Sequence, residues 1–249
     1  MQTASRRRSV TLTVCALFMA ISLNCNATDL TGDYAEIRAA ISRLIPGLKQ
    51  IEIQPSAIEG MLEVRSGTKI YYVSSDGGFL LHGPLYTLER GENLTEIRLA
   101  EYRKILLKDI PAIQPVEYPA DNAQQTLTVV TDIDCPYCRR LHLELDKYHQ
   151  AGFDVDYVML PRSGKNSPSY VKTVNAICAA QPAMAITAAM NGETPAPAEC
   201  DHPIDQHMQM ARALGISSTP SLVLPDGKVM VGYRTATELS RLLSAANQD

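Results

Sequence analysis

The sequence predicts a two-domain protein, with a small α+β domain in its first half and an α/β domain in its second half. Three observations support this prediction. A short amphipathic helix pattern is followed by β-rich runs before residue 90, a helical stretch and several prolines then interrupt the pattern, and from residue 126 a strand leads directly into a cysteine pair and a helix. The length of 249 residues fits one or two compact domains better than three.

The first residues have the pattern of an export signal. Three arginines precede an apolar run from Val10 to Leu23, and Ala27 offers a small residue for cleavage. We therefore expect residues 1–27 to be a signal peptide. A membrane anchor is the alternative, but this run is shorter than the roughly 20 residues that a spanning helix needs. Twin-arginine and lipoprotein variants of the signal stay open.

Composition and charge describe a folded protein that does not bind nucleic acid. Hydrophobic residues make up 45% of the chain and charged residues 20%, which suits packed cores and not disorder. Removal of the signal takes away three arginines and no acids, so the formal net charge changes from −4 to −7. No basic run remains that would bind a phosphate backbone.

The first domain, residues 28–90, combines one helix with short strands. The run from Asp33 to Ile45 has its apolar residues on one face, and Asp33 with Glu36 fits a capping box. β-rich runs follow at 62–64, 69–74 and 79–82, the last two joined by Asp-Gly-Gly, which is typical of a hairpin. A domain of about sixty residues buries little surface, so we expect it to pair with a second copy; packing on its own chain is the alternative.

A linker helix is expected at residues 91–110, because Asn93 to Lys108 is rich in helix formers and prolines follow it. The catalytic domain, residues 111–249, begins its regular structure with the strand TLTVVT. The later elements are a helix from Arg139 to Gln150, a strand at 155–160, a helical stretch at 169–190, a helix at 204–214, a hairpin in SLVLPDGKVMVGY, and a last helix whose capping box is Thr235 with Glu238.

The pair Cys135 and Cys138, in the sequence CPYC, lies at the start of a predicted helix. Helix N–H groups and the helix dipole favour a thiolate there, so we expect Cys135 to be an exposed nucleophile and Cys138 a sheltered resolving cysteine. Nearby acids, Asp132 and Asp134, oppose this effect, while two following arginines support it. We expect the cations and the dipole to prevail and to lower the pKa of Cys135.

Redox chemistry explains this pair better than the alternatives do. A zinc site needs further ligands at compact spacing, and Cys178 and Cys200 stand alone, so we expect no metal and no cofactor. A purely structural bridge between residues three apart would remove little unfolded-state entropy. Cys178 and Cys200 instead enclose roughly 20 residues, and a disulfide there would stabilise the fold by about 3 kcal/mol, so we interpret this second pair as structural.

Two further features accompany the cysteines. Thr219-Pro220 precedes a predicted strand, where a cis bond would leave the Thr219 backbone free to pair with an extended substrate. His142 comes four residues after Cys138. It is either a solvated side chain, which is the commoner case, or a proton shuttle near the cysteines.

These motifs together resemble a known family. A CPYC after a strand, a late Thr-Pro before a hairpin and an inserted helical region resemble an exported thioredoxin-fold domain. The segments IQPSAIEGMLEV and IYYVSSDGGFLLHGPLY resemble the cystatin-like N-terminal dimerisation domain of the DsbC family of periplasmic disulfide isomerases. The resemblance implies a periplasmic homodimer whose cleft holds misfolded or mis-oxidised exported proteins, and a membrane reductase of the DsbD type that keeps the dithiol reduced.

The resemblance also assigns roles to single residues. It makes Cys135 the nucleophile, Cys138 the resolving cysteine, Pro220 a cis-proline preceded by Thr219, and Cys178 with Cys200 a buried structural disulfide. One position departs from the pattern, because the typical isomerase has glycine where this chain has Pro136, and CPYC instead resembles the DsbG branch. The second cysteine pair, however, resembles DsbC and is missing from DsbG.

The predicted function is therefore isomerisation or reduction of incorrect disulfides, with a chaperone role beside it. Two alternatives stay open at this point. One is a DsbG-like reductase that protects single cysteines from over-oxidation. The other is a dimeric holdase whose apolar cleft binds unfolded chains without thiol chemistry.

Overall fold

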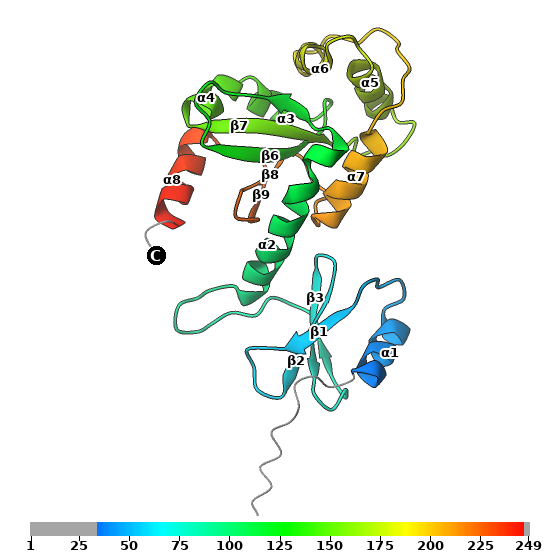
Figure 1. Cartoon of the computed structure of the whole chain (residues 1–249), viewed down its shortest axis with the longest axis vertical. Coiled ribbons are helices and arrows are strands. Elements are labelled where there is room, and N and C mark those ends of the chain that lie inside the picture. The colour runs from blue at the N-terminus through cyan, green and yellow to red at the C-terminus, as the bar shows by residue number, and fades with distance from the viewer. Residues whose placement is uncertain (1–33, 247–249) are drawn as a thin grey trace, which may run out of the picture. The chain divides into compact units, whose positions relative to one another are not determined.

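The computed structural model describes residues 34–246 (Figure 1). The expected signal peptide and the expected cap at Asp33 lie outside the described residues. The described chain contains a four-stranded and a five-stranded sheet, each with its own hydrophobic core. Among residues 34–246, no helix has the length and apolar character needed to cross a membrane.

The four-stranded sheet belongs to the first domain and is antiparallel throughout, in the order β1-β2-β3-β4. Its elements are α1 (Ala35–Leu44), β1 (Glu52–Pro55), β2 (Met61–Ser66), β3 (Lys69–Ser74) and β4 (Leu80–Leu81). Ile41 of α1 packs with Val64, Tyr71 and Val73 of the sheet. The predicted helix and hairpin are confirmed, whereas β1 was not predicted, because this edge strand is mostly exposed and carries little apolar pattern.

Helix α2 (Leu94–Leu106) forms the predicted linker helix. It begins at Asn93, whose side-chain oxygen accepts a hydrogen bond from the N–H of Glu96 at 3.0 Å. Two 3-10 turns, η1 (Leu107–Asp109) and η2 (Pro111–Ile113), lead from it toward the second sheet.

The five-stranded sheet has the order β5-β7-β6-β8-β9, in which β6 and β7 are parallel and the other neighbours antiparallel. Its strands are β5 (Val116–Tyr118), β6 (Gln125–Thr131), β7 (Phe153–Met159), β8 (Ser221–Val223) and β9 (Val229–Val231). β5 was not predicted, because Pro115 and Pro119 flank it. Such prolines are tolerated next to an edge strand, which is what β5 is.

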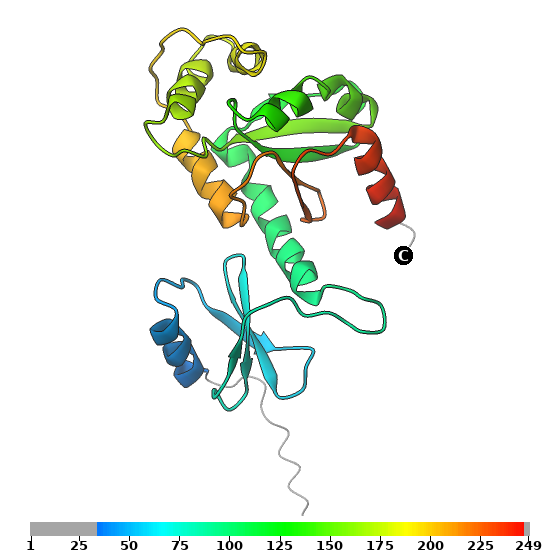
Figure 2. The same ribbon diagram turned by 180° about the vertical axis from the view of Figure 1, so that it is seen from behind.

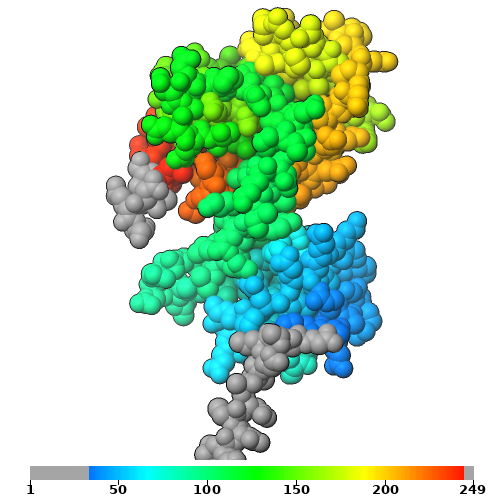
Figure 3. Space-filling model, viewed as in Figure 1, coloured from blue at the N-terminus to red at the C-terminus, as the bar shows by residue number. Residues whose placement is uncertain are grey.

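Helices cover both faces of this sheet (Figures 1 and 2). Helices α3 (Pro136–His142) and α4 (Leu145–Gln150) lie on one side of β6 and β7, and the segment from Lys104 to Pro111 lies on the other. Helix α8 (Ala236–Ala246) starts beside α4, where the hydroxyl of Tyr148 donates to the carbonyl oxygen of Arg234. The inserted helical region contains α5 (Pro168–Ile177), α6 (Pro182–Met190) and α7 (Ile204–Ala213), coloured yellow-green to orange in Figure 3. The predicted capping box of α8 is confirmed, because the N–H of Glu238 donates to Thr235 Oγ1 and the N–H of Thr235 donates to Glu238 Oε2.

The prediction of one helix from Arg139 to Gln150 is wrong, because the chain breaks into α3 and α4 at Leu143 and Glu144. Glu144 leaves the helical backbone region, with φ −109° and ψ 14°. Its carboxylate accepts a hydrogen bond from the hydroxyl of Tyr233, which is 89 positions away. A contact over this distance leaves no trace in the local sequence pattern.

Asp156 of β7 makes the stability of the second domain depend on pH. Burial, together with the charges of Glu117 and Asp154, raises the pKa of Asp156 to about 6. The unfolded carboxyl has a pKa of about 3.9. The native state therefore holds this proton more tightly, so stability falls as the pH rises from about 4 to about 6 and the penalty persists above that range.

We expect Asp156→Asn to raise the free energy of unfolding by about 1 kcal/mol at pH 7.5 and by much less at pH 4. This value is smaller than the free energy that corresponds to the full pKa shift, because the carboxyl is partly exposed and solvent screens its charge. Chemical unfolding of both proteins at the two pH values measures this. Asp121→Asn, at an exposed acid of the same domain, is the control and should change little. If Asp156→Asn raised the free energy of unfolding equally at both pH values, the raised pKa of Asp156 would not be the cause.

Candidate active site

The cysteine pair lies where β6 ends and α3 begins. After Thr131 the chain turns tightly, and the N–H of Cys135 donates to the carbonyl of Asp132 at 3.0 Å. Cys135 is the N-cap residue of α3, and Pro136 occupies the first turn, where its missing N–H costs no helical hydrogen bond. Cys138 follows one turn into the helix, and both cysteines are free thiols.

Both cysteines are buried, with 2% of Cys135 and 1% of Cys138 exposed. The prediction of an exposed nucleophile is therefore wrong for this dithiol form. Thr219 provides part of the cover, because the thiol of Cys135 donates a hydrogen bond to the carbonyl oxygen of Thr219 at 3.4 Å. A substrate sulfur has to displace this contact. Tyr137, between the two cysteines, is 61% exposed and offers a surface for such a substrate.

Thr219 and Pro220 lie next to the cysteine pair because of the strand pairing. β8 starts at the following residue, Ser221, which pairs with Val130 near the end of β6. The Thr219–Pro220 peptide bond is cis. Within the described chain the hydroxyl oxygen of Thr219 is buried and has no hydrogen-bond partner while Cys135 is a thiol. This hydroxyl is therefore free to donate to the sulfur once the thiolate forms.

The two cysteines differ in acidity. Burial raises the pKa of Cys135, but hydrogen bonding to the Thr219 side chain and to N–H groups at the start of α3 outweighs burial, so the pKa lies below the usual range of a thiol. Burial raises the pKa of Cys138 to about 12. The first cysteine is thus prepared to attack as a thiolate, and the second keeps its proton until it reacts.

The charged side chains near the pair largely neutralise one another. Asp134 forms ion pairs with Lys172 at 2.8 Å and with Arg139 at 3.3 Å. The guanidinium of Arg140 stacks on the ring of Tyr233, 4.6 Å from the ring centroid. The predicted lowering of the Cys135 pKa is confirmed. Hydrogen bonds from Thr219 and from the N–H groups at the helix start cause it, whereas the two arginines, which the prediction also included, are not among its main causes.

Asp132 joins three segments around the active site and is 3% exposed. Its Oδ1 accepts hydrogen bonds from the N–H of Asp134 and from the hydroxyl of Ser169, at the start of α5. Its Oδ2 accepts from the N–H and the Nε of Arg162, at 3.1 and 3.2 Å. From the sequence, Asp132 was expected only to oppose the ionisation of Cys135 by its charge. Its partners lie 30 and 37 positions later, beyond the reach of a spacing argument.

His142 is 6% exposed, so the expectation of a solvated side chain is wrong. Its two ring nitrogens each lie 3.1 Å from a hydroxyl oxygen, one of Tyr157 and one of Thr187. The ring also meets Tyr118 edge-on, with 5.3 Å between centroids. Burial lowers the pKa of His142 to about 4, so the ring is neutral at pH 7. The inserted helix α6, which carries Thr187, is what covers it.

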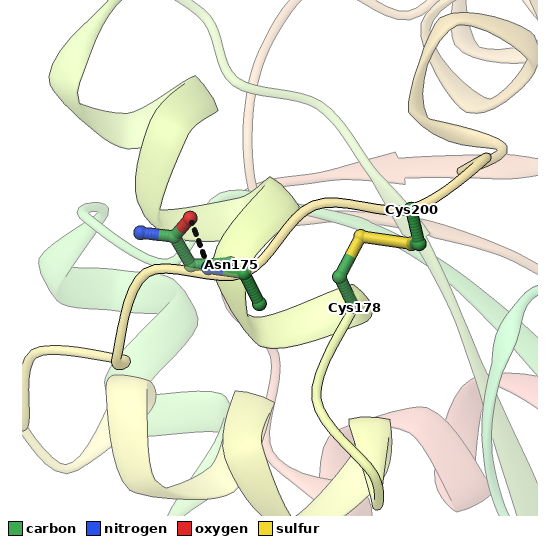
Figure 4. Close-up of a disulfide and its surroundings, with 4 residues drawn as sticks. Asn175, Cys178 and Cys200 are labelled. Carbon is green, nitrogen blue, oxygen red and sulfur yellow. Dashed lines mark hydrogen bonds between the residues drawn. A yellow bond between two sulfur atoms is a disulfide. The ribbon is translucent and has the colours of Figure 1, made fainter.

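Cys178 and Cys200 form a disulfide inside the helical insertion (Figure 4). Cys178 is the C-cap residue of α5, and Cys200 lies 22 positions later in the irregular segment before α7, with the Cα atoms 5.5 Å apart. The expectation that this disulfide is buried is wrong, because Cys178 is only half-buried and Cys200 is exposed. A second tie is the hydrogen bond from the N–H of Ala198 to the side-chain oxygen of Asn175 at 3.3 Å. Together these contacts hold residues 193–202, which contain no helix or strand. In the described part of the chain, no three His, Cys, Asp or Glu side chains are grouped to hold a metal ion.

Comparison with known proteins places both sheets in recognised domains. Residues 28–96 match a family model described as the disulfide bond isomerase protein N-terminal domain, and residues 113–247 match a thioredoxin-like domain. These matches confirm the predicted two-domain layout and the predicted thioredoxin fold.

Curated relatives match over most of the chain. The thiol:disulfide interchange protein DsbC of Dickeya dadantii is 36% identical over 215 residues, which cover 86% of this chain and 87% of the relative. DsbC of Escherichia coli K12 is 32% identical over 215 residues, with 85% and 87% covered. A crystal structure of a disulfide interchange protein from Neisseria gonorrhoeae is 28% identical, covers 52% of this chain and 94% of that chain, and has a TM-score of 0.47.

Proposed function

Because the chain belongs to the DsbC family of thiol:disulfide interchange proteins, we propose that it rearranges incorrect disulfides in exported proteins through Cys135 and Cys138. The protein is a thiol:disulfide oxidoreductase of the isomerase kind, and its relatives do not favour the DsbG-like or the holdase alternative. The observation that supports the assigned residues best is the opposite shift of the two thiol pKa values.

The chemistry follows from this difference. The Cys135 thiolate attacks a substrate disulfide, forms a mixed disulfide and releases one substrate thiolate, which then attacks elsewhere in the substrate. If this rearrangement stalls, Cys138 loses its proton and attacks the sulfur of Cys135, and the substrate leaves as a thiolate. The resulting active-site disulfide is reduced again by two electrons from a membrane reductase of the DsbD type. Thr219 and Pro220 line the approach of the substrate.

Each part of the chain has its own role in this proposal. Residues 1–27 direct export to the periplasm, residues 28–90 form the dimerisation domain, residues 91–110 the linker helix and residues 111–249 the catalytic domain. The signal-like start and the Cys178–Cys200 disulfide support an oxidising compartment.

Exposed apolar side chains on the first domain support a homodimer. β4 is an edge strand of its sheet. Leu81 on this strand is 54% exposed, Phe79 directly before it is 75% exposed, and Leu88, seven residues after Leu81, is fully exposed. An edge strand with exposed apolar residues is a template for pairing with another chain, so a second copy of this domain is the partner that we assign to it.

We expect Leu81→Arg to weaken self-association by at least about tenfold, because a charge would enter the apolar contact. Sedimentation velocity at micromolar concentration measures this. Leu44→Arg is the matched control, since Leu44 is also exposed, at 67%, but belongs to α1 and not to the edge strand. If Leu44→Arg gives monomers and Leu81→Arg does not, the interface lies on the helix and this assignment is wrong.

The function itself is tested by recovery of activity from scrambled ribonuclease in a glutathione buffer. The full mature protein should restore activity well above the buffer rate. Leu81→Arg should restore little, although its thiols react normally with Ellman's reagent. Feeble recovery by a dimeric protein with reactive thiols would contradict isomerisation and favour simple reduction.

A further inference from the structure

Arg103 is a buried charged residue that the thiol chemistry described above does not use. It lies on α2, and only 7% of it is exposed. A charged side chain is rarely buried unless its donors are paired. The Nε of Arg103 donates to the carbonyl oxygen of Leu214 at 3.0 Å, and its Nη1 donates to Glu96 on the same helix at 2.6 Å. The same Nη1 lies 3.5 Å from the carbonyl oxygen of Gly227. Arg103 therefore attaches α2 to two separate points of the second domain.

Close backbone packing accompanies the contact at Gly227. This residue has a φ of +85°, which glycine adopts more easily than any residue with a side chain. A Cβ atom at this position would lie 1.9 Å from the carbonyl oxygen of Ala100, a buried residue of α2. The turn that contains Gly227 thus packs directly on the backbone of the helix. By these contacts α2 belongs to the packed body of the second domain and is more than a tether to it.

The two attachment points flank the segment that covers the nucleophile. Leu214 is the C-cap residue of α7, and Gly227 lies between β8 and β9. Residues 215–226, between these two points, contain Thr219 and the whole of β8. The carbonyl oxygen of Thr219 accepts the hydrogen bond from the thiol of Cys135. One arginine side chain therefore contacts both ends of the segment that presents Thr219 to Cys135.

The first part of this segment has no regular structure that would hold it in place. Residues 216–220 belong to neither a helix nor a strand. The loop starts at the end of α7, where the last carbonyls lack intrahelical donors. Arg103 supplies such a donor to Leu214, and its positive charge suits the negative end of the helix dipole. The guanidinium therefore fixes the point from which the loop runs to the cysteines.

We propose that Arg103 is a positioning residue for the dithiol, because it holds both ends of residues 215–226 and so keeps Thr219 in contact with Cys135. This inference rests on the proposed function of the dithiol. Hydrogen bonding to the Thr219 side chain lowers the pKa of Cys135, since it favours the thiolate. A loosened segment weakens this contact and leaves less thiolate near neutral pH. A residue of the linker helix thus sets the reactivity of a thiol that it does not touch.

The pH dependence of the reaction with Ellman's reagent tests this role in the reduced protein. The fast phase in a stopped-flow instrument reports attack by Cys135. Arg103→Met should move the rise of this rate to higher pH and slow it by about threefold at pH 6, with a rate close to that of the wild type at pH 9. Arg103→Lys should shift the profile in the same direction, because one ammonium group cannot bridge two carbonyls. Arg98→Met is the control, since Arg98 lies on the same helix but pairs with Glu63 and Glu101; it should leave the profile unchanged.

Gly227→Ala tests the same contact from the other side. The added methyl group would push the turn away from Ala100, so the profile should shift as it does in Arg103→Met. Gly152→Ala is the matched control, because Gly152 has a similar φ of +88° but nothing lies within 4 Å of an added Cβ atom. It imposes the backbone strain alone and should keep the wild-type profile.

A merely structural role for Arg103 predicts a different result. Folded Arg103→Met protein that melts at a lower temperature but keeps the wild-type pH profile would overturn the positioning role. A wild-type profile in Arg103→Lys would show that the charge, and not the two-point attachment, is what matters, which also overturns it. If Arg103→Met does not fold, Arg103→Lys and Gly227→Ala decide the question. Absence of the fast phase in the wild type would instead contradict the proposed function.

Discussion

Cys135→Ala is expected to reduce the recovery of scrambled ribonuclease to the rate of the buffer alone, a loss of at least about 10³-fold in thiol exchange. The other free thiol, Cys138, cannot replace it, because burial raises its pKa to about 12 and leaves almost no thiolate at pH 7. The reaction with Ellman's reagent should lose its fast phase. A variant that keeps this phase would show that a different sulfur is the nucleophile.

Cys138→Ala is the matched control for this substitution, since it removes the same group from a residue that is equally buried. It should keep the fast attack by Cys135 and accumulate mixed disulfides, because the group that releases stalled substrates is gone. Suppression of aggregation by Cys135→Ala should equal that of the wild type if the apolar surfaces bind unfolded chains independently. Loss of both activities in Cys135→Ala would count against a separate chaperone role.

The sequence pattern correctly predicted those features that depend only on residues close together in the sequence. The capping box of Thr235 and Glu238, the hairpin after β3 and the cysteine at the start of α3 all depend on residues within a few positions of one another. Edge strand β1 escaped prediction because it is mostly exposed and carries little apolar pattern, and edge strand β5 escaped because prolines flank it.

The cysteine pair of the candidate active site was predictable from the sequence, and its surroundings were not. CPYC marks the dithiol, but the cover over Cys135 comes from Thr219, 84 positions later, and the cover over His142 comes from α6. The sign of the Cys135 pKa shift was predictable from the helix start. The contribution of Thr219 was not predictable, because this residue comes 84 positions later, and the expected effect of Arg139 is offset by an ion pair with Asp134.

Asp132→Ala should cause the largest loss of stability among the substitutions considered, about 3 kcal/mol, or roughly 10 °C in the melting temperature. The change leaves the hydroxyl of Ser169 and two backbone N–H groups without their acceptor in a buried place. Water can restore part of the loss near Arg162, whose side chain is 43% exposed. Thermal and urea unfolding measure the effect, and the reaction with Ellman's reagent shows whether the cysteine turn is kept.

Asp134→Ala is the control that separates the loss of the buried hydrogen bonds of Asp132 from the simple loss of a negative charge near the thiols. Asp134 lies two residues later and also pairs with cations, but its side chain is 30% exposed and its ion pairs with Lys172 and Arg139 face solvent. Such pairs contribute at most about 1 kcal/mol, so this variant should unfold nearly like the wild type. If the two variants lose equal stability, the hydrogen bonds of Asp132 do not join the helical insertion to the active site. If Asp132→Ala alone is destabilised, the position of the insertion depends on the same carboxylate that shapes the turn before Cys135.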